Sequence, residues 1–410
     1  MSRRCSLARQ DQEGQQDVSA TDTLDKTGTQ TSAVRLGDLE TPCLVLDADR
    51  MDRNIARLRD RIAGLGVTLR PHLKTAKSVE VARRVMATSE GPATVSTLKE
   101  AEFFADAGVR DIIYAVGIAP WKLAKVIELR KRGVDLAVVL DTVELAQAVA
   151  AASRESGMAI PALIEIDCDG HRSGVLPRDS ERLLAIGKAL VEGGELRGVL
   201  THAGGSYAAR GEEALRNAAE EERASVVNAA AILRDAGLPC PVVSVGSTPT
   251  AHHATDLTGV TEVRAGVFVF FDLVMTGIGI CTVDDIAISV LATVIGHQRE
   301  KGWILVDAGW MAMSQDRGTA KQVVNQGYGV VCKCDGTPYA DLILADANQE
   351  HGIIMVRPGS DGTLPDLAIG DRVRILPNHA CATGAQHRRY NVVHGTSDVV
   401  TGEWQRFGGW

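Results

Sequence analysis

The sequence has no apolar run long enough to span a membrane, and its start lacks the apolar core of a secretory signal. It also lacks a disulfide framework, because its eight cysteines are scattered through 410 residues. An excess of basic charge is missing too, since the formal net charge is -8. We therefore expect a protein of a reducing compartment, with a cytoplasmic location, no membrane partner and no nucleic-acid partner.

Residues 1–34 are polar and have almost no apolar periodicity. This composition is typical of a disordered tail, and we expect no catalytic role for it. The rest of the chain has the ordinary hydrophobic and charged content of a globular enzyme, and its length favours a barrel plus a second domain.

Strand and helix patterns alternate from residue 47 to residue 272. Asp47 or Asp49 is expected to cap a first helix whose apolar stripe includes Met51 and Ile62. Eight β-type runs then follow, separated by amphipathic helix patterns such as 143–153 and 213–236. The runs lie at 67–69, 94–96, 111–115, 136–140, 163–166, 198–201, 242–245 and 262–264. Such alternation calls for parallel strands, so residues 47–272 are predicted to form an α/β fold, a (β/α)8 barrel.

The pattern changes after residue 272. Short β-type runs dominate residues 273–410, an Asp335-Gly336 pair suggests a hairpin turn, and long helix patterns are missing. A second, mostly β domain is expected there.

The segment Arg70-Pro71-His72-Leu73-Lys74-Thr75 follows the first predicted barrel strand. The carboxyl ends of barrel strands are where catalytic groups converge. A lysine at such a place can lose its proton through desolvation, and it then serves as a Schiff-base former or a general base. Considered alone, Lys74 is more simply explained as a solvated surface lysine.

Two glycine-containing loops follow the last two predicted strands. They are Gly246-Ser247-Thr248 and Gly266-Val267. Glycine lets backbone N–H groups approach a phosphate, and hydroxyl groups add further donors. This position matches the usual phosphate site of such barrels, so we expect a phosphate here rather than two ordinary turns.

Two further loops carry polar side chains after predicted strands. Arg172 lies in Asp169-Gly170-His171-Arg172-Ser173-Gly174, and its forked guanidinium suits a carboxylate. His202 and Tyr207 lie in the next such loop and are expected to contact a cofactor ring. A helix-capping loop with a surface arginine and a packed core histidine remain the alternatives.

A His-x-Cys pair, His379 and Cys381, leads out of a predicted strand. If both side chains lie on one side, imidazole and thiolate form a ligand set that favours Zn2+ over Mg2+. Two protein ligands leave positions open for water and substrate. Cys332 and Cys334 are a rival pair, although core packing on a strand explains them adequately.

The Arg70–Lys74 segment, the paired glycine loops and the His-x-Cys pair together resemble fold type III pyridoxal phosphate enzymes. This is the alanine racemase-like class, and the similar branch contains the D-serine dehydratases and D-threonine aldolases. The resemblance covers nearly all of the chain after Leu36. It implies that the strand within residues 35–46 joins the β domain, and that this domain carries the metal site.

The resemblance also implies roles for single residues. Lys74 is expected to bind pyridoxal 5'-phosphate, with Arg172 beside the cofactor phenolate or the substrate carboxylate. Arg264 occupies the position of the ring-nitrogen arginine of alanine racemase. His379 and Cys381 are expected to hold Zn2+, with Mn2+ and Co2+ left open. Residues 310–319 are expected near the site mouth, in this subunit or extended to a neighbouring one. Residues 349–352 are expected to orient a metal ligand without binding the metal directly.

The expected activity is dehydration of a small-molecule D-3-hydroxy amino acid to a 2-oxo acid and ammonia. D-threo-3-hydroxyaspartate is the preferred substrate in this hypothesis, with D-serine and D-threonine as alternatives, and a homodimer is expected by analogy. An aldolase that uses the same residues is the main alternative. A pyridoxal phosphate-binding regulatory protein would lack the β domain and the metal motif, and a plain zinc hydrolase would leave Lys74 unexplained.

Overall fold

The computed structural model describes residues 33–410, which contain an eight-stranded parallel sheet and a nine-stranded, mostly antiparallel sheet. The parallel sheet has the order β2-β9-β8-β7-β6-β5-β4-β3. Its strands are β2 (Thr68–Pro71), β3 (Ala93–Val95), β4 (Asp111–Gly117), β5 (Asp135–Leu140), β6 (Pro161–Ile166), β7 (Glu195–Thr201), β8 (Val242–Val245) and β9 (Glu262–Ala265). Each corresponds to one of the eight runs expected from the sequence.

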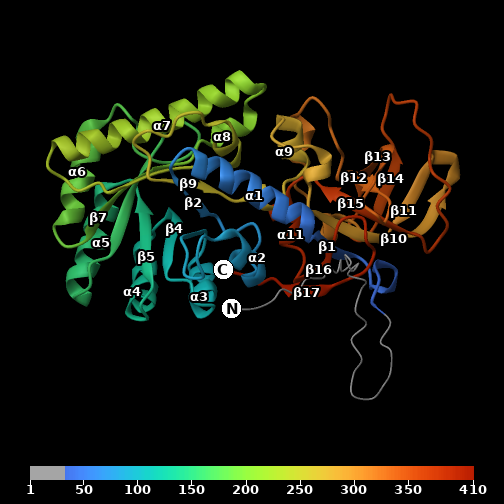
Figure 1. Ribbon diagram of the computed structural model, residues 1–410, viewed down its shortest axis with the longest axis horizontal. Helices are drawn as coiled ribbons and strands as arrows, with labels where there is room; N and C mark the ends of the chain where they lie inside the picture. Colours follow the sequence, from blue (N-terminus) through green and yellow to red (C-terminus); the bar gives the residue numbers. More distant parts are fainter. Residues whose placement is uncertain (1–32) are drawn as a thin grey trace, which may run out of the picture.

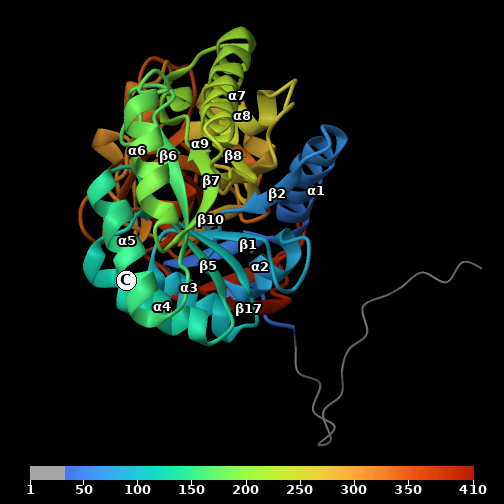
Figure 2. The same cartoon turned by 90° about the vertical axis from the view of Figure 1, so that its left-hand side faces the viewer.

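Helices surround this sheet and make it a nearly closed barrel, as Figure 2 shows for the helices α4 to α7. The barrel helices are α1 (Ala48–Gly64), α2 (Val79–Val85), α3 (Leu98–Asp106), α4 (Leu123–Lys131), α5 (Val143–Ser156), α6 (Ser180–Val191), α7 (Glu212–Asp235) and α8 (Thr248–His253). The predicted α/β barrel of the alanine racemase-like kind is confirmed.

Helix α1 shows why the sequence forms these elements. The Asp47 carboxylate accepts hydrogen bonds from the backbone N–H groups of Asp49 and Arg50, so Asp47 is the N-cap. The predicted apolar stripe of α1, which includes Met51 and Ile62, is buried.

Strands β2 and β3 close the barrel loosely. Only a single bridge, between His72 and Thr94, joins the two edges. An ion-pair network around the buried Arg70 reinforces this side: Arg70 Nε lies 2.7 Å from the buried Glu262 Oε2, and Arg70 Nη1 lies 2.7 Å from Oδ1 of the half-exposed Asp111. Because the three residues belong to β2, β9 and β4, the guanidinium ties together strands on both sides of the gap.

The second sheet lies beside the barrel in Figure 1 and has the order β11-β14-β13-β12-β15-β10-β1-β16-β17. Its strands are β1 (Cys43–Asp47), β10 (Ile288–Gln298), β11 (Trp303–Val306), β12 (Gly329–Cys332), β13 (Pro338–Ala347), β14 (Gly352–Val356), β15 (Arg372–Pro377), β16 (Arg389–Val393) and β17 (Gly402–Gln405). Strand β1 pairs with β10 and β16, which places the start of the described chain within this sheet.

The α-helices beyond the barrel are short, as the missing helix patterns indicated. They are α9 (Leu273–Ile278), α10 (Trp310–Met313) and α11 (Ala380–Gly384). Seven 3-10 segments complete the described chain: Leu36–Asp38, Pro120–Lys122, Gly204–Ala208, Val267–Val269, Val283–Asp285, Arg299–Lys301 and Gly318–Lys321.

Residues 1–32 of the expected tail lie outside the described residues. Regular contacts begin slightly earlier than the sequence suggested, because the Val34 carbonyl accepts a hydrogen bond from the Val400 N–H. The boundaries 35–46, 47–272 and 273–410 remain predictions. Within residues 33–410 no helix combines the length and apolar character that a membrane span needs, and the seven cysteines described there are free.

Candidate active site

One cavity of about 390 Å³ lies between the carboxyl ends of the barrel strands and the second sheet. All twelve residues proposed from the sequence line it, although they come from distant parts of the chain. They are Lys74, Arg172, His202, Tyr207, Gly246, Ser247, Thr248, Arg264, Gly266, Val267, His379 and Cys381. The structure therefore brings the predicted residues together, while the role of each stays a prediction.

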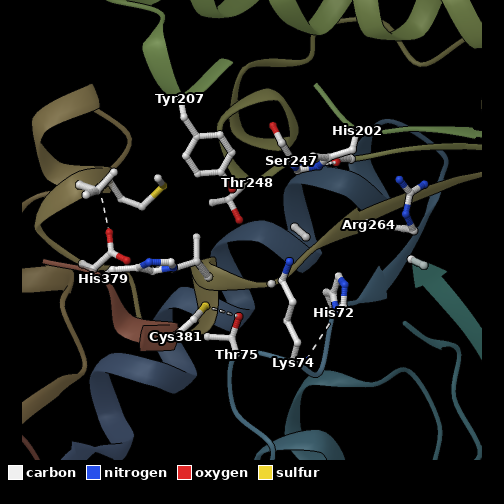
Figure 3. Close-up of a pocket in the computed structure, with 18 of the residues that line it drawn as sticks. His72, Lys74, Thr75, His202, Tyr207, Ser247, Thr248, Arg264, His379 and Cys381 are labelled. Atoms are coloured by element: carbon white, nitrogen blue, oxygen red, sulfur yellow. Dashed lines mark hydrogen bonds between the residues drawn. The ribbon is translucent and has the colours of Figure 1, made fainter. Parts of the chain in front are cut away.

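Lys74 follows β2 and points into the cavity, with Cys381 and Thr75 on one side and His72 on the other (Figure 3). The loop is held from behind, because the Leu73 N–H donates to the Thr94 carbonyl at 2.9 Å. Lys74 is exposed to the cavity, which differs from the expectation of a desolvated lysine. The difference follows from the open cavity into which the side chain extends.

The loop Gly246-Ser247-Thr248 and the neighbouring Gly266 form a cradle that side chains would block. A Cβ atom on Gly246 would lie 1.9 Å from the Arg264 carbonyl oxygen, and one on Gly266 would lie 3.0 Å from Thr75 Oγ1. The Thr248 hydroxyl is buried and has no hydrogen-bond partner within the described residues. Close backbone approach and an unpaired hydroxyl fit a phosphate group.

Glu222, on α7, supports this cradle from behind. Its Oε1 atom accepts hydrogen bonds from the N–H groups of Gly246 at 3.0 Å and Ala203 at 2.9 Å. The side chain is almost fully buried, and burial raises the pKa of Glu222. This residue was not predicted from the sequence, because a glutamate within a long amphipathic helix resembles any other polar helix position.

His202 and Tyr207 stand at the opposite side of the cavity from Lys74 (Figure 3). His202 Nδ1 lies 2.6 Å from the Gly246 carbonyl oxygen, so Nδ1 carries the proton and donates it to that oxygen. Burial lowers the pKa of His202 to about 4, which leaves a neutral ring at neutral pH. Burial also raises the pKa of Tyr207, so its phenol stays protonated.

Arg264 is buried in β9 at the edge of the cavity. Its guanidinium donates to the Ser244 hydroxyl and to the Thr201 carbonyl. Burial lowers the pKa of Arg264, although the nearby Glu262 and Glu222 carboxylates oppose this effect. Its contact with a cofactor ring nitrogen remains a prediction.

Arg172 lies at the mouth of the cavity with 57% of its side chain exposed. Its Nη2 atom lies 3.2 Å from Glu165 Oε1. The loop that carries Arg172 is fastened to the next loop, because Asp169 Oδ2 accepts a hydrogen bond from the Gly205 N–H at 2.7 Å. A partly solvated guanidinium in this place is suited to a substrate carboxylate.

His379 and Cys381 lie at the other wall of the cavity, near Lys74 (Figure 3). They follow the end of strand β15: His379 is the N-cap of α11, and Cys381 is in its first turn. His379 Nδ1 lies 2.6 Å from Asp316 Oδ2, and Cys381 Sγ lies 3.3 Å from Thr75 Oγ1.

The electrostatics of this pair favour a thiolate. Burial opposes charge on both groups, but hydrogen bonds to Asp316 and Cys381 raise the pKa of His379 to about 11, and the bond to His379 lowers the pKa of Cys381. Thiolate is the form of cysteine that binds metals. Since residues 33–410 contain no group of three or more His, Cys, Asp or Glu arranged to hold a metal, these two residues would supply a two-ligand site.

The rival cysteine pair lies elsewhere. Cys332 is fully buried in β12 and Cys334 follows that strand, and neither lines the cavity. Burial raises the pKa of Cys332 to about 12, which opposes thiolate formation. This geometry agrees with the packing interpretation.

The two segments assigned to the site surroundings behave differently. Asp316 and Gly318 line the cavity. Asp316 contacts His379 of the same chain, so this contact forms without a neighbouring subunit. Residues 349–351 are exposed outside the cavity, and the Gln349 carbonyl instead accepts from the Met311 N–H. Among the described residues, no hydrogen bond joins residues 349–352 to His379 or Cys381, and their proposed role behind the metal ligands stays a prediction.

Two family models match the chain. The one described as "Alanine racemase, N-terminal domain" matches residues 46–274, and the "Putative serine dehydratase domain" matches residues 287–393. The chain is 57% identical to a D-threo-3-hydroxyaspartate dehydratase from Delftia sp. (strain HT23) over 91% of this chain and 98% of that protein. It is 29% identical to a D-serine dehydratase from Dictyostelium discoideum over 89% of this chain and 96% of that protein.

Solved structures show the same similarity. The Delftia sp. HT23 D-threo-3-hydroxyaspartate dehydratase aligns with a TM-score of 0.89 and 56% identity, over 92% of this chain and 100% of that one. D-threonine aldolase from Filomicrobium marinum aligns with a TM-score of 0.78 and 26% identity, over 91% and 96%. The chain therefore belongs to the fold type III pyridoxal phosphate family, in the branch that joins an alanine racemase N-terminal domain to a serine dehydratase domain.

Proposed function

We propose that this protein is a pyridoxal phosphate- and metal-dependent carbon–oxygen lyase that dehydrates a D-3-hydroxy amino acid. The preferred substrate is D-threo-3-hydroxyaspartate, and the products are oxaloacetate and ammonia. The relative with 57% identity over nearly the whole chain carries this activity in its name. Among the solved structures, one variant of that enzyme replaces a cysteine and is described as metal-free, and another replaces a histidine two positions earlier, the same spacing as His379 and Cys381.

One observation carries the proposal: a lysine suited to proton transfer and a histidine–cysteine pair suited to a metal line the same cavity. The two halves are in direct contact, because Thr75, which follows Lys74, lies 3.3 Å from Cys381. Removal of the α-proton and departure of the β-hydroxyl need groups on adjacent carbon atoms of the substrate. A site with both functions side by side suits β-elimination.

The residues divide the work as follows. When bound, pyridoxal phosphate supplies an electron sink at the α-carbon, and a divalent metal supplies a Lewis acid at the β-hydroxyl. Gly246, Thr248 and Gly266 would hold the phosphate, and His379 and Cys381 would hold the metal. Arg172 orients the substrate carboxylate at the cavity mouth.

Lys74 performs the proton transfer. Its Nζ atom takes the α-proton, the Cβ–O bond breaks, and the hydroxyl leaves as water after gaining a proton. The resulting enamine becomes an imine, and water then hydrolyses the imine to the 2-oxo acid and ammonia. One water is released and one is consumed, so the overall reaction is substrate to 2-oxo acid plus ammonia.

The metal is proposed to be Zn2+, because imidazole and thiolate are borderline-soft ligands, with Mn2+ and Co2+ as alternatives. A homodimer and a cytoplasmic location complete the proposal. The homodimer rests on the family resemblance, and the cytoplasmic location rests on the free cysteines among residues 33–410.

An aldolase is the second candidate function. A 3-hydroxy-D-aspartate aldolase from Paracoccus denitrificans (strain Pd 1222) is 26% identical over 86% of this chain. In this alternative a base takes the proton of the β-hydroxyl, and the Cα–Cβ bond breaks instead of the Cβ–O bond.

Product analysis separates the two candidates. Purified protein is incubated with D-threo-3-hydroxyaspartate, pyridoxal phosphate and Zn2+. Oxaloacetate and ammonia support the dehydratase, while glyoxylate and glycine support the aldolase. Lys74→Ala should abolish both the reaction and the absorbance band of lysine-bound cofactor, and a fully active Lys74→Ala variant would refute the proposed role of the lysine.

A further inference from the structure

Arg406 is a buried arginine near the end of the chain that has no carboxylate partner within the described residues. Its side chain is 6% exposed. All its hydrogen bonds instead go to backbone carbonyls and to one phenol oxygen. Since a buried guanidinium needs its donors satisfied, the carbonyls that it contacts are fixed in place relative to one another.

On one side Arg406 contacts the loop that carries Lys74. Its Nε atom donates to the Ala76 carbonyl at 3.0 Å, and Nη2 donates to the Thr75 carbonyl at 3.4 Å. Nε also donates to the Tyr390 hydroxyl at 2.8 Å, and that hydroxyl donates in turn to the Ala76 carbonyl. The loop directly after Lys74 is therefore held twice.

On the other side Arg406 contacts the end of the helix that carries the predicted metal ligands. Its Nη1 atom donates to the His387 carbonyl at 3.0 Å and also to the carbonyl of Gly384, the last residue of α11. The fit is close, because a Cβ atom on Gly384 would lie 3.2 Å from Arg406 Nη2. One guanidinium thus bridges the Lys74 loop and α11 behind the cavity.

The next residue fastens this bridge to the barrel. Phe407 packs on Phe103 of α3, with 4.0 Å between the ring centroids, and its N–H donates to the Lys77 carbonyl at 3.1 Å. Strand β17, which directly precedes Arg406, also contacts α2 of the barrel. The ring contact with Phe103 anchors Arg406 to α3, which lies outside the two segments that Arg406 joins.

We propose that Arg406 is a positioning residue that sets the spacing between Lys74 and the His379–Cys381 pair. The inference rests on the proposed function, in which these groups act on adjacent substrate atoms. Arginine suits this task because its planar fork presents five donors at fixed angles, whereas lysine has three donors on a flexible stem. Loss of the Arg406 guanidinium would let the Lys74 loop and α11 move relative to each other, without removing any group that touches the substrate.

The test compares Arg406→Lys and Arg406→Met with Arg389→Met. Arg389 is a suitable control because it lies on β16 of the same sheet, is half-exposed and pairs only with Glu403 at 3.4 Å. The first readout is backbone hydrogen exchange of the protein without cofactor or metal. Faster exchange in residues 75–77 and 380–387 together, in both Arg406 variants but not in the control, is the expected result.

The second readout separates the halves of the reaction. Exchange of the α-proton of D-alanine with solvent deuterium needs Lys74 but no β-hydroxyl, while ammonia release from the hydroxy substrate needs both. We expect Arg406→Lys to lower Zn2+ affinity and kcat for elimination by about 10–100-fold, the usual effect of losing a supporting contact at a metal site, and α-proton exchange far less.

Two results would overturn the inference: unchanged hydrogen exchange in both segments, or an equal loss of α-proton exchange and elimination. If Arg406→Met does not fold, Arg406→Lys and Tyr390→Phe carry the test, because each keeps a buried polar or aromatic group in place. Failure of the proposed function would appear separately, as a wild-type protein that releases no ammonia, and the hydrogen-exchange result would still decide the role of Arg406.

Discussion

Asp316 Oδ2 lies 2.6 Å from His379 Nδ1, so the carboxylate holds the histidine ring through that nitrogen. A carboxylate that holds the far nitrogen of a ligating histidine sets the tautomer and makes the near nitrogen a better metal ligand. This contact makes Asp316 the supporting residue of the predicted metal site. A substitution of Asp316 therefore tests the proposed metal site while His379 and Cys381 stay in place.

Asp316→Asn should weaken Zn2+ binding by about 10–100-fold, because the amide is a poorer acceptor for the ring N–H. The cofactor absorbance band should not change. Calorimetric titration with Zn2+ measures the effect, and Asp361→Asn, an exposed aspartate, is the control. Equal Zn2+ affinities in the two variants would exclude this role for Asp316.

Glu222→Ala should destabilise the protein and weaken cofactor binding. The change leaves the buried N–H groups of Gly246 and Ala203 without an acceptor, which costs about 1–3 kcal/mol for each group. Glu222→Gln should lose much less, because its carbonyl oxygen can still accept both bonds. Urea unfolding and titration with pyridoxal phosphate measure the two effects, and equal losses in both variants would contradict the explanation.

Gly246→Ala should weaken phosphate binding at the cradle. The added methyl group would overlap the Arg264 carbonyl oxygen, so the loop must move, at a cost of about 1–3 kcal/mol. Gly117→Ala is the matched control, since nothing lies within 4 Å of its Cβ position. Normal cofactor affinity in Gly246→Ala, measured by absorbance titration, would show that the cradle is misplaced.

Stability should fall as the pH falls below about 6.5. Burial lowers the pKa of both His202 and His252 to about 4 in the folded chain, so the unfolded chain binds more protons between these values. The contribution of these two histidines to the free energy of unfolding is therefore complete above the ordinary histidine pKa and is lost as the pH falls towards about 4. Each histidine contributes a slope of up to about 1.4 kcal/mol per pH unit in this window.

His252→Gln should reduce that slope, whereas His351→Gln, at an exposed position, should not. Urea unfolding of the cofactor-free protein at several pH values between 7 and 5 measures the difference. A wild-type slope of zero or of opposite sign in this range would contradict the assigned pKa values.

The barrel was predictable because its strands are short apolar runs and its helices have regular apolar stripes. The cavity was predictable in part, because catalytic side chains in such a barrel follow the strand ends. Lys74 and the Gly246 loop were found in this way. The assignment of the strand at Cys43 to the second sheet depended on the family resemblance, because a five-residue apolar run fits either sheet equally well.

The supporting residues could not be predicted for a physical reason. Glu222 acts through backbone groups 19–24 residues away in the sequence. Arg406 joins backbone groups 19–22 residues away to others about 330 residues away, and a backbone contact leaves no pattern in the side chains. Strands β16 and β17 were also missed, because short runs among charged residues resemble loops. The His379–Cys381 pair leads out of β15 as predicted, but the short helix α11 that begins directly after His379 was not predicted.

The interior position of β1 in the second sheet limits which fragments of the chain can form that sheet. A fragment that begins after β9 would lack the strand between β10 and β16 and would present two unpaired strand edges, which invite aggregation. During synthesis, all barrel strands are therefore made before β10 and β16 can pair with β1. The sheet is finished only when both ends of the described chain have met, so residues 273–410 alone would not make a complete second sheet.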